Sequence, residues 1–170
     1  FGIAYPFGKM DLVAVPDFGA GAMENAGLVT FRDMLLFVND QSSLDLQKGN
    51  AYIIAHEFAH MWFGNLVTLA WWDDLWLNEA FASWAETHVI DDIRPRFRAT
   101  VDARSGSDWV TGVDSLVTAR QIRQPVKGKG DILNAFDSIT YTKGASVIAM
   151  FESWIGADVF QRGVQRYLQS

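Results

Sequence analysis

The stretch that decides the fold is residues 56–81, HEFAHMWFGNLVTLAWWDDLWLNEAF, within a chain of 170 residues. It holds two of the three histidines, His56 and His60, which lie four positions apart around Glu57. Because a helix turns by about 100° per residue, both rings leave the same helical face and can converge on one ion. Glu57 is rotated by about 100° from His56, so it can reach a water on that ion without binding the ion itself. The spacing predicts a metal site with a separate carboxylate base.

The ligands of this site follow from its chemistry. The H-E-x-x-H arrangement places two imidazoles on zinc and uses the carboxylate between them to take a proton from zinc-bound water. A catalytic zinc site usually has three protein ligands and one exchangeable position. Since cysteine is absent, imidazole and carboxylate are the available ligands, and Glu79 in the next helix is the natural third one. We expect one zinc ion bound by His56, His60 and Glu79.

Glu86 lies seven residues after Glu79, about 20° from the same helical face. This spacing predicts that Glu86 accepts a hydrogen bond from a ligand histidine and fixes its tautomer. An exposed helix carboxylate is the alternative that the residues leave open. The alternative for the histidine pair is two imidazoles satisfied without metal, but apolar neighbours such as Phe58 and Met61 would make their burial costly without a partner. His88 is expected on a helix surface.

The composition limits the class of protein. Hydrophobic residues make up 49% and aromatic residues 14% of the chain, which favours one compact domain over disorder. A formal net charge of -6 argues against nucleic-acid binding. No apolar run is long enough for a membrane helix. The lack of cysteine and of a signal segment favours the cytoplasm, although the residues leave the location of a longer parent chain open.

The remaining pattern predicts an α+β fold, mostly helical with a small N-terminal β region. Residues 9–38 are typical of a strand, a Gly/Ala-rich loop at 17–27 and a second strand. The polar, basic stretch 118–131 is expected to be a loop, either solvated or at the rim of a pocket. Helices are expected from about 48 to 63 with Gly64 as a left-handed cap, from 73 to about 90, over 96–109, over 137–155, and over 158–169.

Three motifs stand in a fixed order along the chain. They are GAMEN at residues 21–25, HEFAH with eighteen residues between it and Glu79 in WLNEAF, and YTKGA from Tyr141. In this order and spacing they resemble the gluzincin zinc aminopeptidases, which include aminopeptidase N and the leukotriene hydrolase. The resemblance covers essentially the whole chain. It implies a thermolysin-like zincin catalytic domain over residues 1–170, with the family's N-terminal β-rich domain and C-terminal helical domain outside these residues.

The resemblance implies roles around the zinc ion. His56, His60 and Glu79 would be its ligands, and Glu57 would be the general base. Tyr141 would donate its hydroxyl hydrogen bond to the oxyanion, a contribution of roughly 3 kcal/mol per donor. By its residues alone, Tyr141 is equally well a partly buried tyrosine at a helix start.

The GAMEN stretch would bind the substrate, a peptide with a free N-terminus. Glu24 would hold the ammonium group, which fixes the scissile bond one residue from the chain end and makes the enzyme an exopeptidase. The backbone of residues 21–22 would align the peptide. The implied substrate-binding residues are Gly21, Ala22, Met23, Glu24 and Asn25.

The leading interpretation is therefore zinc-dependent hydrolysis of the N-terminal residue from peptides. An epoxide hydrolase or an endopeptidase with the same zinc site, or a non-catalytic zinc-stabilised interaction module, are the alternatives. Two positions depart from the family pattern: Ala26 stands where tryptophan is usual, and Ala80 where glycine is usual. We expect both to reshape the pocket and leave the chemistry intact. The isolated chain is expected to expose apolar patches and to have weak or no activity.

Overall fold

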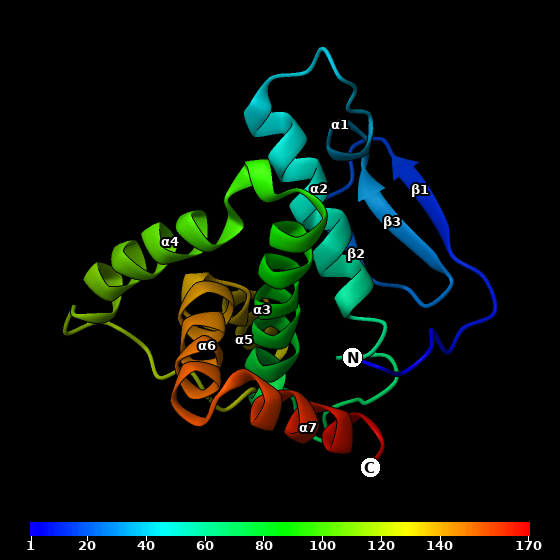
Figure 1. The fold of residues 1–170 in the computed structure, drawn as a ribbon. Coiled ribbons are helices and arrows are strands. Elements are labelled where there is room, and N and C mark those ends of the chain that lie inside the picture. Colours follow the sequence, from blue (N-terminus) through cyan, green and yellow to red (C-terminus); the bar gives the residue numbers. More distant parts are fainter.

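A small sheet lies beside a group of helices in the computed structural model, which describes residues 1–170 (Figure 1). The three strands are β1 (Asp11–Val15), β2 (Ala22–Met23) and β3 (Leu28–Arg32), in the order β1-β3-β2. Strand β1 runs parallel to β3, and β2 runs antiparallel to it. The predicted α+β class, mostly helical with a small N-terminal β region, is confirmed.

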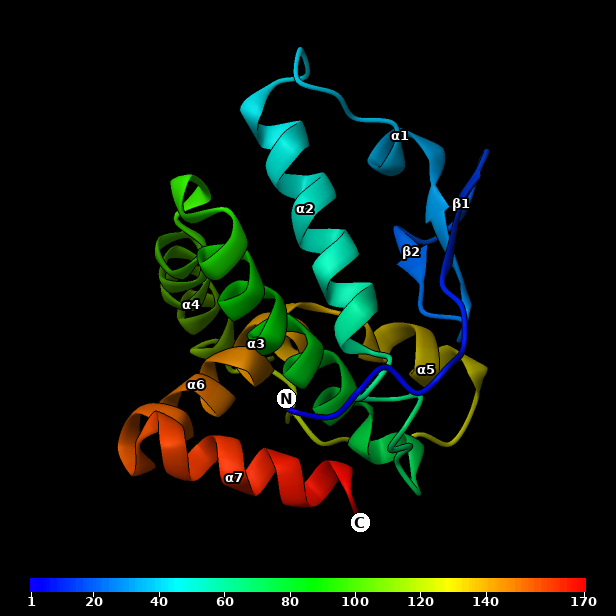
Figure 2. The same cartoon turned by 45° about the vertical axis from the view of Figure 1, so that its right-hand side comes forward.

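The helices follow the sheet in the sequence. They are α1 (Asp33–Leu36), α2 (Leu44–Ala59), α3 (Leu75–Ile93), α4 (Ala99–Asp114), α5 (Lys129–Ala135), α6 (Gly144–Ile155) and α7 (Ala157–Leu168). Shorter turns are the 3-10 segments Trp72–Asp74 and Pro95–Phe97 and the π-helix Ile139–Lys143. The sheet lies on one side of α2, whereas α3, α4 and α6 lie on the other (Figure 2). None of the helices is long and apolar enough to cross a membrane.

Helix α2 begins and ends about four residues before the predicted limits. Ser43 caps its start, because the hydroxyl oxygen accepts the backbone N–H of Leu46 at 3.3 Å. The helix ends at Ala59, and His60 then donates from Nδ1 to the carbonyl oxygen of Phe63 at 2.9 Å. This bond closes a turn where the sequence predicted another helical turn. Gly64 does have a positive φ of 124°, but within that turn and not as the helix cap.

Small side chains let α2 and α3 pack closely. Ala59 on α2 and Ala82 and Ala85 on α3 form one buried cluster, and Ala55 packs near Ile90 in another. Because alanine projects only a methyl group, helix axes can approach at the short end of the usual 8–10 Å range. The close approach brings the histidine face of α2 opposite the first turns of α3.

The predictions for the later helices hold in part. Helix α3 and the 3-10 turn before it cover the expected segment, and α4 lies three to five residues later than expected. The stretch 118–131 is a loop only to residue 128, because α5 starts at Lys129. The carboxylate of Asp131 accepts the N–H groups of Lys127 and Gly128 and so fixes that start. The single helix expected over 137–155 begins instead as the π-helix and continues as α6.

Helix α7 is amphipathic, as predicted. Val164 and Leu168 are buried in a cluster with Phe63, and the partly buried Phe160 and Tyr167 pack against this cluster.

The expected exposed apolar side chains are also present. Those more than half exposed include Phe37, Trp71, Trp109, Leu133 and Trp154.

Candidate metal centre and active site

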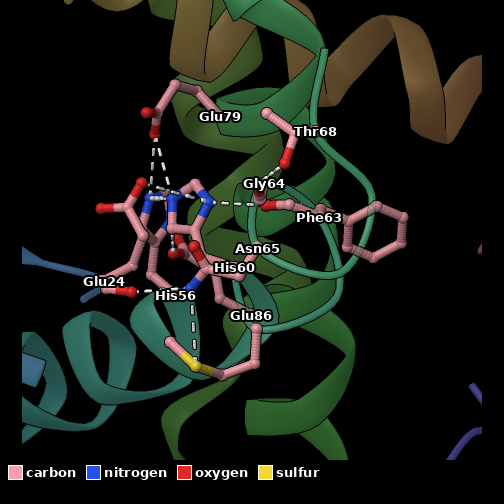
Figure 3. Close-up of polar contacts among 10 residues, drawn as sticks. Glu24, His56, His60, Phe63, Gly64, Asn65, Thr68, Glu79 and Glu86 are labelled. Atoms are coloured by element: carbon pink, nitrogen blue, oxygen red, sulfur yellow. Dashed lines mark hydrogen bonds and ion pairs between the residues drawn. The ribbon is translucent and has the colours of Figure 1, made fainter. Parts of the chain in front are cut away.

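Three buried side chains meet between α2 and α3. The Nε2 atoms of His56 and His60 lie 3.0 Å apart, and Glu79 Oε2 lies 3.2 and 3.3 Å from them. Dashed lines join the Glu79 carboxylate to both rings in Figure 3. Ligands about 2.0 Å from a tetrahedral ion lie roughly 3.3 Å apart. The three groups fit one metal ion, since one ligand atom from each lies within 4.8 Å of the others.

A hydrogen bond at Nδ1 orients each of the two imidazole rings. His56 Nδ1 lies 2.8 Å from Glu86 Oε2, and His60 Nδ1 lies 2.9 Å from the carbonyl oxygen of Phe63. Because both acceptors require an N–H at Nδ1, the Nε2 atoms are the ones that face Glu79 and are placed to bind a metal ion once deprotonated. The Glu86 side chain is 24% exposed, so it is partly solvated and also contacts His56.

The electrostatics of this group favour positive charge. Burial lowers the pKa of His56, but hydrogen bonds to Glu79 and Glu86 outweigh it and raise the pKa to about 10. Burial also lowers the pKa of His60, but the hydrogen bond to Glu79 and the charges of Glu79 and Glu24 together raise it overall. Burial raises the pKa of Glu79, yet hydrogen bonds from His56 and His60 lower it to about 2. A carboxylate that stays ionised between two imidazoles suits a divalent cation.

Glu57 differs from Glu79 in its surroundings. It is buried, and its Oε2 has no hydrogen-bond partner in the protein. Burial raises its pKa to about 7, against the lowering effect of His56 and His60. A buried carboxyl oxygen without a partner lowers the stability of the fold unless a ligand or water donates a hydrogen bond to it. A carboxyl that titrates near neutral pH is suited to proton transfer.

Tyr141 lies in the π-helix, with its ring centroid 5.8 Å from that of His56. Burial, followed by the charge of Glu79, raises the pKa of the phenol above its usual value. The hydroxyl therefore stays protonated at neutral pH and can donate a hydrogen bond. Short π-helical segments often occur at functional sites, because one extra residue re-aims a side chain.

A cleft of about 820 Å³ has His56, Glu57 and Tyr141 in its wall, together with Gly21 and Ala22. His60 and Glu79 do not line it. Neither of the two departures from the family pattern lies in this wall. Ala26 is exposed elsewhere, and Ala80 is fully buried. A Cβ added at Gly144 would lie 2.7 Å from the Ala80 methyl carbon, so Ala80 packs against the chain that carries Tyr141. Neither side chain lines the cleft, so the expectation that the two positions reshape it stays a prediction.

The GAMEN stretch lies along the edge of the sheet. Strand β2 pairs with β3 on one side only, and Gly21 is held by its carbonyl, which accepts the N–H of Arg32 at 2.8 Å. Glu24 Oε1 lies 4.0 Å from His60 Nδ1, with the side chain 21% exposed. Met23 is exposed, and Asn25 Nδ2 lies 3.4 Å from Thr30 Oγ1. The stretch thus offers one carboxylate next to the histidines and a free strand edge.

The sequence matches the family described as "Peptidase family M1 domain" over residues 1–170. The chain belongs to peptidase family M1. It is 43% identical to Aminopeptidase M1 of Arabidopsis thaliana over 100% of this chain and 20% of that protein. It is 45% identical to "Aminopeptidase 2, mitochondrial" of Saccharomyces cerevisiae, over 99% of this chain and 18% of that protein. It is 42% identical to Tricorn protease-interacting factor F2 of Thermoplasma volcanium, over 99% of this chain and 22% of that protein.

The M1 chain contains two sets of side-chain hydrogen bonds near this site that sequence reasoning missed. Asn65 donates from Nδ2 to the carbonyl oxygen of Glu24 at 2.7 Å and so ties the GAMEN stretch to the turn after α2. The Gly64-Asn65 pair is a turn signal that would have drawn attention to it. Arg120 bonds to Asp137 and Thr140 beside the π-helix, and no local pattern marks this contact.

Proposed function

We propose that this M1 chain is the catalytic domain of a zinc aminopeptidase that removes the N-terminal residue from peptides. The observation that carries the proposal is one centre with three buried ligand atoms within 4.8 Å of one another and a separate buried carboxyl, Glu57, with an oxygen left free. The relatives named as aminopeptidases support the same reaction. The chain spans about a fifth of their length, so the whole protein's activity and its flanking domains are part of the proposal.

His56, His60 and Glu79 would hold the zinc ion. Two imidazoles and one carboxylate without sulfur make up a donor set typical of catalytic zinc, and the distances among them fit one ion. Glu86 would fix the tautomer of His56 through the contact at Nδ1. Zinc, when bound, supplies a Lewis acid that lowers the pKa of water and polarises a carbonyl.

Glu57 would act as the general base and then as the general acid. Its pKa of about 7 lets it accept a proton from the attacking water and pass it to the leaving amine without a large energetic penalty in either direction. Tyr141 would donate its hydroxyl hydrogen bond to the oxygen of the scissile carbonyl as negative charge develops there. Its raised pKa keeps that proton available at neutral pH.

Glu24 would bind the ammonium group of the substrate and so limit cleavage to the first peptide bond. The free edge of β2 supports the proposed alignment, because an extended peptide can add to an exposed strand by backbone hydrogen bonds. A non-catalytic zinc module would need neither a free base oxygen nor a protonated phenol next to the ligands. An endopeptidase would not need Glu24 to hold an ammonium group.

The test compares two substrates and one variant in the full-length protein loaded with zinc. We expect cleavage of a peptide with a free N-terminus and none of the same peptide after N-acetylation. Glu57→Gln should still bind one zinc ion but lose turnover by about 10²- to 10⁴-fold, the usual contribution of a positioned proton-transfer group. Equal cleavage of both peptides would contradict the role of Glu24, and retained turnover in Glu57→Gln would contradict that of Glu57.

A further inference from the structure

The guanidinium of Arg120, in the loop between α4 and α5, is held by every one of its nitrogen atoms. Nε donates to Asp137 Oδ2 at 2.9 Å, and Nη2 donates to Asp137 Oδ1 at 2.5 Å, which makes a bidentate pair. Nη2 also donates to Thr140 Oγ1 at 2.7 Å. The backbone carbonyl oxygens that accept from Nη1 or Nη2 are those of Gln121, Ile122 and Ala135. Charge-assisted bidentate pairs of this kind stabilise the contact and also fix the relative orientation of the guanidinium and the carboxylate.

Both side chains that Arg120 contacts belong to the start of the π-helix. Asp137 Oδ1 accepts the N–H groups of Ile139 and Thr140 at 3.0 and 3.1 Å, and the Asp137 carbonyl accepts the N–H of Tyr141 at 3.1 Å. Thr140, directly before Tyr141, is almost completely buried. The guanidinium is therefore bonded to the carboxylate that accepts the first two N–H groups of this turn and to the residue next to the tyrosine.

A π-helical turn depends on outside contacts more than an α-helical turn does, since the π form is rare and short. At its C-terminal end, Lys143 bonds to Asp114 of α4 at 2.7 Å, and the chain then meets α3 at Gly144 and Ala80. At its N-terminal end, the Arg120 contacts are the corresponding attachment. The tyrosine lies between these two fixed points.

We propose that Arg120 is a positioning residue for Tyr141, which sets where the phenol hydroxyl meets the substrate oxygen by holding Asp137 and Thr140. The inference rests on the proposed function, because it assigns a purpose to the placement of that hydroxyl. Lysine cannot replace the arginine here, since an ammonium group lacks the planar fork that engages both Asp137 oxygens at once. A misplacement of about 1 Å in a catalytic group can cost about 10²-fold in rate.

The experiment uses the full-length, zinc-loaded protein and a peptide with a free N-terminus. Arg120→Lys and Arg120→Ala should each lower kcat by about 10- to 100-fold while KM changes by less than about 3-fold, because the contact acts on the hydroxyl and not on substrate binding. In a Tyr141→Phe background, the same substitutions should cause no further loss. Arg123→Ala is the matched control, since Arg123 lies in the same loop but pairs with Asp74 outside the π-helix. It should retain wild-type turnover.

A second readout does not depend on activity. In the metal-free protein, hydrogen–deuterium exchange should become faster over residues 137–145 in Arg120→Ala and stay unchanged over α2. Added guanidinium ion should restore part of the lost kcat in Arg120→Ala. An additive loss in the Tyr141→Phe background, or unchanged exchange over 137–145, would overturn the positioning role. Failure of the proposed function would look different: the wild-type protein would not cleave the peptide, whereas the exchange experiment would still report on Arg120.

Discussion

Gly144→Ala should separate the π-helix from α3 and lower both stability and turnover. The new Cβ would lie 2.7 Å from the Ala80 methyl carbon. Carbon atoms in contact prefer about 3.5–4.0 Å, so the two segments would have to move apart by roughly 1 Å. Both atoms belong to backbone-anchored methyl groups, so no side-chain rotation can relieve the overlap. Ala80 follows Glu79, and Gly144 lies three residues after Tyr141, so the movement changes the distance between the tyrosine and the metal centre.

Two effects of opposite sign set the size of the stability change. Overpacking of a core costs about 1–3 kcal/mol. Replacing a helical glycine by alanine returns up to about 1 kcal/mol. The net loss should be about 1–2 kcal/mol, which corresponds to a fall of roughly 2–8 °C in Tm for a chain of this size.

The structure also supplies the compensating change. Ala80→Gly removes the methyl group that causes the overlap, and the next neighbours of the new Cβ are Trp76 Cε3 at 3.5 Å and the Ala80 Cα at 3.6 Å. These are ordinary contact distances. In the double variant, α3 loses one methyl group and gains a glycine, whereas α6 gains one methyl group and loses a glycine. Its stability should therefore lie within about 1 kcal/mol of the wild-type value.

The assay is urea denaturation followed by tryptophan fluorescence, for which the chain has seven tryptophans. Peptide cleavage by the full-length variants is measured in parallel. A double-mutant cycle should give a favourable coupling of about 1–3 kcal/mol between the two positions. If Gly144→Ala keeps wild-type stability and turnover, or if the double variant is no better than the single one, the reasoning about this contact is wrong.

Two further predictions concern the metal. Glu86→Gln should weaken zinc affinity by about 10- to 100-fold, because it changes the hydrogen bond at His56 Nδ1. Zinc titration against a chelator measures this. Glu152→Gln, whose carboxylate bonds to Trp84 and His88 and not to His56, should leave the affinity unchanged. Zinc binding should release a proton at neutral pH. Burial lowers the pKa of His56, but its carboxylate partners raise it to about 10. Below that pH, zinc must therefore displace the proton from His56. Affinity should rise about tenfold per pH unit between pH 7 and 9 for one such proton. Calorimetry in buffers of different ionisation enthalpy checks it, and equal apparent enthalpies in all buffers would disprove it.

Local pattern was enough to predict the groups that share one helix face. His56 and His60 lie one turn apart, so their convergence follows from helical geometry alone. The inward residues of α7 follow from the same periodicity, and Val164 and Leu168 are buried as it requires. The meeting of the two histidines with Glu79 needed more, because it depends on the alanines that let α2 and α3 approach.

The features that sequence reasoning missed are decided by contacts between distant residues. The end of α2 depends on the bond from His60 to the Phe63 carbonyl, and the start of α5 depends on one carboxylate, Asp131. Arg120 reaches Asp137 across seventeen positions that include a loop and helix α5, so no single periodicity relates the two residues. Ala80 packs against Gly144, which lies sixty-four positions later in the chain. Such pairs can be recognised only when the fold brings them together.

The two buried glutamates at the centre illustrate how the fold gives identical residues different pKa values. Burial acts on both and raises the pKa of each carboxyl. Glu79 lies against two imidazoles, whose hydrogen bonds reverse that effect and bring its pKa to about 2, whereas Glu57 has one oxygen without a partner and a pKa of about 7. A permanently ionised carboxylate suits a metal ligand, and one that titrates near neutral pH suits a proton carrier. The two environments drive the pKa values of Glu57 and Glu79 apart. To exchange their proposed roles, the contact between α2 and α3 would have to be rebuilt, because substitution of the side chains alone would leave both environments in place.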